Sequence, residues 1–214
     1  MEIYQSIAKH LADGDAETVL QLVKTAVDEG AHAKTILDQG LMGGMEIIGG
    51  MMEREEILIP EVLGAAEIME NAIETILKPH LVGEDMKPFG KVVFATVKGD
   101  IHDIGKNLVI MMLESAGFDV VDMGVDVAPE AIVAEIKNQA PRLLCLSALL
   151  TTTMPMVKTT IDAVKESGLR EQVKILIGGA PLDEAFAEEA GADGYALDAS
   201  AATKEAKRLV EAGA

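Results

Sequence analysis

From residue 91 onward, short β-rich segments alternate with amphipathic stretches, and this alternation constrains the fold more than any other feature of the chain. Strands that alternate with helices build a parallel sheet that is covered on both faces. Right-handed crossovers between five short strands favour a doubly wound, flavodoxin-like sheet with the strand order 2-1-3-4-5. The five segments are KVVFATV at 91–97, FDVVDMG at 118–124, RLLCLSAL at 142–149, VKILIGG at 173–179 and GYALD at 194–198.

The carboxyl ends of the strands are where a sheet of this kind binds its ligands, at the switch between strands 1 and 3. The segments 98–105, 147–153 and 178–181 follow the first, third and fourth predicted strands. We therefore expect the functional residues in these three loops.

The first 80 residues have helical periodicity throughout. Ile7 and Leu11 share one helix face, and Asp15 can cap the helix that follows. A third helix is expected over about 33–53, and a fourth has Pro60 in its first turn. Four helices with short connections predict a four-helix bundle.

The segment 81–90, LVGEDMKPFG, combines glycine, proline and charged residues without any periodicity. Such a composition is typical of a linker. We therefore predict a helical domain at 1–88, followed by an α/β domain at 89–214.

The charge of the chain excludes nucleic acid as an expected partner. The net charge is −18, and acidic residues outnumber basic ones both in 1–90, by 17 to 6, and in 91–214, by 19 to 12. Such a surface repels a phosphate backbone, and the absence of Trp removes the best stacking platform for single strands.

Membrane insertion and cysteine chemistry are not expected either. No apolar run approaches the roughly 20 residues that span a bilayer, and the N-terminus has no secretory signal, so we predict a cytoplasmic protein. Cys145 is the single cysteine and lies in an apolar run. It can form neither an intrachain disulfide nor an iron–sulfur cluster, and we expect it in the core.

The loop after the first predicted strand places a histidine between two aspartates, Asp100-Ile101-His102-Asp103. Histidine is a ready metal ligand through one ring nitrogen, and a carboxylate bonded to the other nitrogen fixes the tautomer and raises the basicity of the ring. Either Asp100 or Asp103 could orient His102 in this way. The alternative is a capping or surface pair without a ligand.

Two further loops carry small polar residues or glycine at the same predicted edge. Ser147 and Leu149 end the third strand and lead into Thr151, while Gly178 and Gly179 end the fourth. A glycine pair removes side chains from the sheet edge and leaves room for a bulky ligand, although small residues at strand ends also serve turns alone.

Taken together, these three motifs resemble a known family. Asp100-x-His102-x-x-Gly105 is followed after 41 residues by Ser147-x-Leu149 and, after 28 more, by Gly178-Gly179. This pattern is similar to that of the cobalamin-binding fold shared by methionine synthase, the corrinoid proteins of methyltransferase systems and several mutases. Residues 42–69 resemble the helical cap of the same proteins.

The resemblance implies a cobalamin or related corrinoid bound base-off, with His102 below the cobalt and Asp100 bonded to its far nitrogen. Thr153 stands where methionine synthase has a serine. In the cap pattern, Met52 and Leu58 stand where aromatic residues are usual, with Ile59 before Pro60. The residues expected to contact the cofactor are Asp100, His102, Asp103, Ile104, Gly105, Ser147, Leu149, Thr151, Thr153, Gly178, Gly179, Met52 and Ile59, and the metal ligand is His102.

The function implied is that of a methyl carrier. It accepts a methyl group on Co(I) from a donor-specific methyltransferase and passes it to an acceptor methyltransferase, and a reductive activase restores oxidised cobalt. Two alternatives share the motifs: the cobalamin-binding subunit of an adenosylcobalamin-dependent mutase and a cobalamin-based sensor. The chain has no room for a mutase's substrate-binding barrel, and it lacks the basic face and the Trp expected of a light-sensing repressor.

Overall fold

The computed structural model describes residues 2–81 and 88–212. The chain divides into two compact units, Met1–Lys87 and Pro88–Ala214. Most of the predicted linker, residues 82–87, lies outside the described residues. Within the described ranges, no helix has the length and apolar character that crossing a membrane requires.

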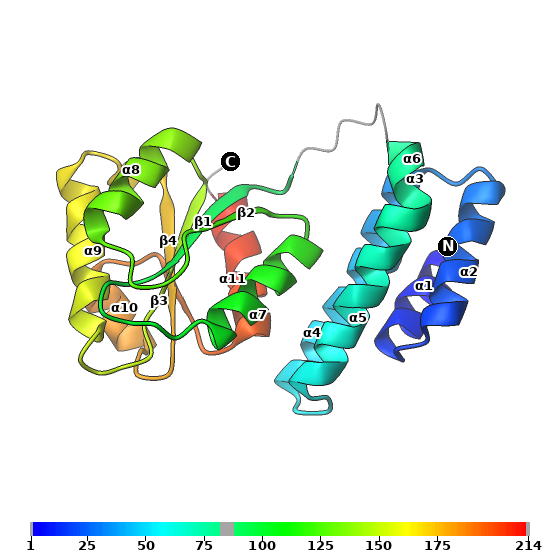
Figure 1. The fold of residues 1–214 in the computed structure, drawn as a ribbon, viewed down its shortest axis with the longest axis horizontal. Coiled ribbons are helices and arrows are strands. Elements are labelled where there is room, and N and C mark those ends of the chain that lie inside the picture. The colour runs from blue at the N-terminus through cyan, green and yellow to red at the C-terminus, as the bar shows by residue number, and fades with distance from the viewer. Residues whose placement is uncertain (1, 82–87, 213–214) are drawn as a thin grey trace. The chain divides into compact units, whose positions relative to one another are not determined.

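Helices alone make up the described part of the first unit (Figure 1). Segments α3, η1 and α4 follow one another without a break and form one continuous helix, as do α5, η2 and α6. Together with α1 and α2 they make four helices. This arrangement confirms the predicted helical bundle. The segments are α1 (Glu2–Ala12), α2 (Ala16–Asp28), α3 (Ala33–Thr35), the π-helical η1 (Ile36–Met42), α4 (Gly43–Glu53), α5 (Ile59–Ala72), the π-helical η2 (Ile73–Leu77) and α6 (Lys78–Leu81).

Local capping explains where two of these helices begin. The Asp15 carboxylate accepts a hydrogen bond from the Thr18 backbone N–H at 3.2 Å, which satisfies one of the free donors at the start of α2. At α5, Pro60 occupies the second position, and the Glu61 carboxylate accepts the Leu58 N–H at 2.6 Å.

Gly44 allows two helices of this unit to approach each other closely. A Cβ atom there would lie 2.8 Å from Leu11 Cδ2 and 3.0 Å from the carbonyl oxygen of Ala8. Helices α1 and α4 therefore pack closely at a position that only glycine fits without rearrangement.

The second unit contains a five-stranded parallel sheet with the order β2-β1-β3-β4-β5, as predicted. Its strands are β1 (Lys91–Thr96), β2 (Asp119–Asp122), β3 (Leu143–Ser147), β4 (Lys174–Gly178) and β5 (Gly194–Ala196). Its helices are α7 (Ile104–Ser115), α8 (Pro129–Gln139), α9 (Met154–Glu166), the 3-10 turn η3 (Arg170–Gln172), α10 (Glu184–Ala190) and α11 (Ala199–Ala212).

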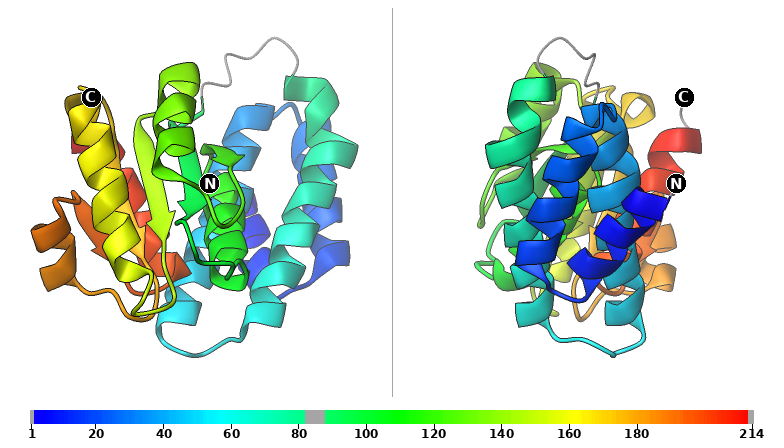
Figure 2. Two further views of the ribbon diagram at one scale, coloured as in Figure 1. Left: turned by 60° about the vertical axis from the view of Figure 1, so that its left-hand side comes forward. Right: turned by 90° about the vertical axis from the view of Figure 1, so that its right-hand side faces the viewer.

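Alternate residues along the strands face two separate cores, which is why the strands are apolar on both sides. Val93 of β1 packs in the core formed with α8, α9 and α10, whereas its neighbour Val92 packs in the core formed with α7 and α11. Figure 2 shows the helices on either side of the sheet. Cys145 is buried in the second core, as expected, and burial raises the pKa of its thiol.

The register of the sheet sets the geometry of the ligand-binding edge. Thr96 pairs with Ser147, and Ser147 pairs with Gly178. The loops that follow β1, β3 and β4 therefore start side by side, although about 50 and 30 residues separate them along the chain.

Candidate functional site

The loop between β1 and α7 carries His102 at the carboxyl edge of the sheet. The imidazole Nδ1 lies 2.7 Å from Asp100 Oδ1, and the His102 backbone N–H donates to the same oxygen at 3.1 Å. The side chain of His102 is 45% exposed, whereas that of Asp100 is completely buried. A buried carboxylate thus engages Nδ1, and Nε2 is the ring nitrogen left for a metal ion.

Asp100 is a buried anion with a full set of donors. Its Oδ2 accepts the Thr153 hydroxyl at 2.6 Å, the Leu149 N–H at 2.7 Å and the Leu150 N–H at 3.3 Å. Burial by itself would raise the pKa of Asp100, but these bonds, together with those from His102, outweigh it and hold that pKa well below its usual range. Asp100 therefore remains charged at neutral pH and keeps the Nδ1–H tautomer of His102 in place.

Asp103, the other candidate partner of His102, is exposed, unlike the buried Asp100. It is the exposed residue that precedes α7, and its carbonyl oxygen accepts the Asn107 N–H at 2.7 Å. The structure therefore pairs His102 with Asp100. Next to Asp103, Ile104 is 79% exposed, and a Cβ on Gly105 would meet nothing within 4 Å, so this side of the loop is open.

The loop after β3 supplies both donors and surface. Ser147 ends the strand and Thr151 is exposed, whereas Thr153 is buried. Thr153 donates its hydroxyl to Asp100, and its methyl carbon would lie 3.7 Å from a Cβ on Gly99. A threonine thus supplies the hydroxyl where the family pattern has serine.

At the end of β4, neighbouring backbone atoms leave no room for a side chain on Gly178 or Gly179. A Cβ on Gly179, whose φ is +134°, would lie 1.9 Å from the Ala148 carbonyl oxygen, and a Cβ on Gly178 would lie 3.0 Å from that of Ala196. At Gly179 the space that we expected to be left for a ligand is filled by the loop after β3. Contact of the glycines with a ligand stays a prediction.

Met52 and Ile59 belong to the helical unit, on α4 and α5. Met52 is half-buried and Ile59 is 44% exposed. Three further large apolar side chains of α4, α5 and the residue before α5 are exposed in this unit: Ile47, Leu58 and Leu63.

Sequence reasoning missed Thr96, the last residue of β1. Its side chain is buried, and its hydroxyl donates to the carbonyl oxygen of His102 at 3.0 Å, which fixes the backbone of the loop. The signal available in the sequence was a threonine that directly follows the apolar run Val92–Ala95. Lys106 was missed too; it is buried in the first turn of α7 and bonds Asp122 at 2.6 Å.

The exposed apolar residues of the second unit gather at the same edge. Within its described residues, six large apolar side chains are exposed, and each lies in a loop that follows a strand or at the start of α7. A rim of this kind suits a large, partly apolar ligand. The six are Ile101, Ile104, Val125, Leu149, Leu150 and Leu197.

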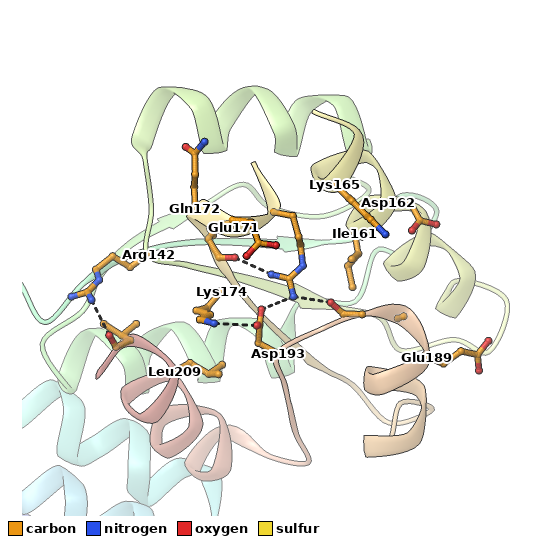
Figure 3. A pocket seen from close by; sticks show the side chains of 15 residues that line it. Arg142, Ile161, Asp162, Lys165, Glu171, Gln172, Lys174, Glu189, Asp193 and Leu209 are labelled. Carbon is orange, nitrogen blue, oxygen red and sulfur yellow. Dashed lines mark hydrogen bonds and ion pairs between the residues drawn. The ribbon is translucent and has the colours of Figure 1, made fainter. Parts of the chain in front are cut away.

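A hollow of about 490 Å³ lies at the opposite edge, where β3 and β4 begin (Figure 3). Arg170 and Lys174 both pair with Asp193 there, at 2.8 and 3.4 Å. Four cationic and four acidic side chains line the hollow, so their formal charges balance. The two ion pairs to Asp193 join β4 to the residue before β5. The histidine and the exposed apolar side chains described above lie at the other edge.

Thr153 offers a stability test of the Asp100 network. Thr153→Val keeps the shape of the side chain but removes the hydroxyl, so at pH 7 it should cost about 1.5–3 kcal/mol, the usual value of a hydrogen bond to a charged group. Because the folded-state pKa of Asp100 is depressed, the deficit should be full above about pH 4 and shrink as the carboxyl protonates in strong acid. Urea unfolding across this range measures it, and Thr153→Ser should recover most of the loss. Equal stability of the Val variant and the wild type at pH 7 would contradict the prediction.

Comparisons with known proteins agree with this geometry. A model described as a B12 binding domain matches residues 90–204, and a second model with the same description matches residues 3–77. Dimethylamine corrinoid protein 1 of Methanosarcina acetivorans is 40% identical over 209 residues, which cover 98% of each chain.

Solved structures match over both units. A cobalamin-binding protein from Desulfitobacterium hafniense has a TM-score of 0.84 and 33% identity over 95% of this chain and 97% of its own. A chain of the methanol:cobalamin methyltransferase complex MtaBC of Methanosarcina barkeri has a TM-score of 0.81 and 31% identity over 98% of this chain and 80% of its own. The protein therefore belongs to the family of corrinoid proteins and consists of two B12 binding domains.

Proposed function

We propose that the protein is a methyl carrier, which accepts a methyl group from a donor-specific methyltransferase and delivers it to a second methyltransferase. The relative from Methanosarcina acetivorans is a dimethylamine corrinoid protein, and the complex from Methanosarcina barkeri is a methanol:cobalamin methyltransferase. Both names support a role in methyl transfer with partner enzymes. A reductive activase is a further expected partner.

One observation carries the proposal: a half-exposed histidine is held by a buried, fully bonded carboxylate in the middle of an apolar rim. A neutral imidazole with one ring nitrogen engaged suits cobalt as an axial ligand. The apolar side chains around it suit the rim of a corrin macrocycle. The described residues contain no group of three or more histidine, cysteine or acidic side chains that could hold a metal ion by themselves, so the fit is to a metal carried by a cofactor.

The chain's own groups then have distinct tasks. His102 Nε2 would be the nitrogen that holds the cobalt of a bound corrinoid, and Asp100 would keep the Nδ1–H side of the ring in place. Thr153 and the backbone N–H groups of Leu149 and Leu150 keep Asp100 anionic and in place. The bound corrinoid supplies a cobalt atom that can accept and release a methyl group.

The remaining predicted contacts are part of the same proposal. Ile104, Gly105, Leu149 and Thr151 lie on the open side of the site and are proposed to contact the corrin or its tail. Met52 and Ile59 stay predicted contacts from the helical unit.

A carrier alone should turn over no substrate. The purified chain, loaded with a cobamide and reduced, should release no product from an isotopically labelled methyl donor. Residues 2–81 and 88–212 present a candidate metal ligand, but within them we find no second cluster of groups that could activate a donor. Addition of one matching donor methyltransferase should move label onto the protein in a single turnover, and a second enzyme should be needed for continued transfer.

A panel of methanol and methylamine methyltransferases, each with its own donor, provides the assay. The chain without cofactor serves as the control for label bound nonspecifically. Steady demethylation of a donor by the loaded chain alone would contradict the carrier function.

A further inference from the structure

The loop after β2, residues 123–128, runs beside the loop that carries His102. The Thr96 N–H donates to the Gly124 carbonyl at 3.0 Å, and the Val127 N–H donates back to the Thr96 carbonyl at 3.1 Å. Val97 and Val127 form a parallel bridge just beyond the ends of the strands. The sheet pairing of β1 and β2 therefore continues into these two loops.

Asp126 makes three separate contacts with consecutive residues of the His102 loop. Its carboxylate accepts the Gly99 N–H at 2.8 Å, and its own N–H donates to the Asp100 carbonyl at 2.8 Å. It also forms an ion pair with Lys98 at 3.1 Å. One side chain and one backbone amide thus hold the segment that leads into the buried Asp100.

The backbone conformation of both partners is unusual. Gly99 has a φ of +84° and Asp126 a φ of +55°, so two residues in the left-handed region face each other. Aspartate and asparagine tolerate this region better than other residues with a side chain. The conformation lets Asp126 direct both its amide and its carboxylate to the same loop.

The contacts also stabilise the charge of Asp126. The Gly99 N–H, followed by the Lys98 side chain, lowers the pKa of the Asp126 carboxyl. The Gly99 amide is therefore bonded to an anion, which is a stronger bond than one to a neutral acceptor.

We propose that Asp126 is a positioning residue for His102. It holds the backbone of residues 98–100 so that Asp100 presents Oδ1 to Nδ1 of His102. Asp126 touches neither His102 nor the proposed position of the metal, and none of the three sequence motifs includes it. The proposal rests on the proposed function, in which His102 is the lower ligand of a corrinoid.

Four variants of the full chain separate the possible roles. Asp126→Gly keeps the left-handed backbone but removes the acceptor, whereas Asp126→Asn keeps both the conformation and an acceptor oxygen. Asp126→Ala removes the acceptor and adds backbone strain. Lys98→Met removes only the exposed ion pair and is the matched control.

Two measurements follow. In the protein loaded with a cobamide and reduced to Co(II), EPR gives the ratio of histidine-ligated to unligated cobalt. In the chain without cofactor, NMR gives the rate of hydrogen exchange at the Gly99 amide. Asp126→Gly should lower the ligation ratio by roughly 10-fold, the lower end of the usual effect when a group supporting a metal ligand is lost. It should also raise the exchange rate, because the Gly99 amide loses its acceptor. Asp126→Ala should do so at least as strongly. Asp126→Asn keeps a neutral and therefore weaker acceptor, so it should fall between Asp126→Gly and the wild type, and Lys98→Met should stay close to the wild type.

The outcomes distinguish this proposal from the carrier function. A wild-type ligation ratio in Asp126→Gly would overturn the positioning role alone. The same loss in Asp126→Asn as in Asp126→Gly would also overturn it, because the acceptor is retained. If wild-type protein binds a cobamide without any histidine on cobalt, the proposed ligand fails and the positioning role fails with it.

Discussion

Replacement of His102 by alanine should abolish the nitrogen splitting from a histidine ligand in the EPR spectrum of the Co(II) protein. His102 is the only histidine after residue 80, so no other imidazole of the second unit can take its place at the metal. Its Nδ1 is engaged by Asp100, which leaves Nε2 as the nitrogen that would cause the splitting. The effect should be complete loss of the signal. The cofactor should still bind, because the exposed apolar side chains of the rim are unchanged. Its affinity should be lower, because the ligand from His102 is lost.

The lower base of a cobamide also carries nitrogen, so the source of the splitting has to be identified. Protein labelled with nitrogen-15 at histidine should change the splitting from a triplet to a doublet in the wild type. His80→Ala, which removes a histidine of α6, should leave the spectrum as it is. A histidine-derived splitting that survives in His102→Ala would contradict the assigned ligand.

The second large effect is expected at Asp100. Asp100→Asn should weaken histidine ligation by about 10- to 100-fold, the usual cost of losing the carboxylate behind a metal-bound histidine. In Asp100, Oδ2 accepts three hydrogen bonds and Oδ1 faces the His102 ring. The amide of Asn replaces one of these two oxygens by an NH₂ group, which donates. Either the Leu149 and Leu150 N–H groups or the His102 ring therefore loses its acceptor. The ligation ratio measured by EPR at pH 7 tests this expectation.

Asp103→Asn is the matched control for Asp100→Asn, because it makes the same chemical change three residues away at an exposed position. It should leave ligation close to that of the wild type. Circular dichroism of both variants checks that the fold is retained. Equal losses of ligation in the two variants would show that Asp100 is not the orienting partner.

The hollow at the start of β4 contrasts with the site. Arg170 and Lys174 pair there with Asp193 across short distances and tie β4 to the residue before β5, so their removal should affect stability more than ligand binding. At the carboxyl edge, by contrast, His102 keeps one ring nitrogen for a ligand, and the surrounding apolar side chains are exposed. This difference distinguishes a structural charge network from a site built for a cofactor.

Much of this protein was determined by local sequence. Alternating β-rich and amphipathic segments predicted the parallel sheet and its order, because apolar strands on both sides need helices on both faces. The helical periodicity of the first 80 residues predicted the four continuous helices of the bundle. Because Asp100, His102 and Gly105 follow the first predicted strand, the sequence placed them at the carboxyl edge of the sheet, and the structure has them there.

Tertiary structure alone decided which groups contact His102. Both Asp100 and Asp103 were possible partners, and only the fold of the loop buries one carboxylate against Thr153, about 50 residues away, and leaves the other exposed. Asp126 could not be found from spacing, since it reaches the loop through the continued pairing of β1 with the segment after β2. Thr96 lies just before the loop, but only the fold of the loop brings the His102 carbonyl to its hydroxyl. At Gly179, likewise, it is the approach of the Ala148 carbonyl that requires glycine. Hydrogen bonds between distant segments depend on the register of the sheet, and that register exists only once the chain has folded.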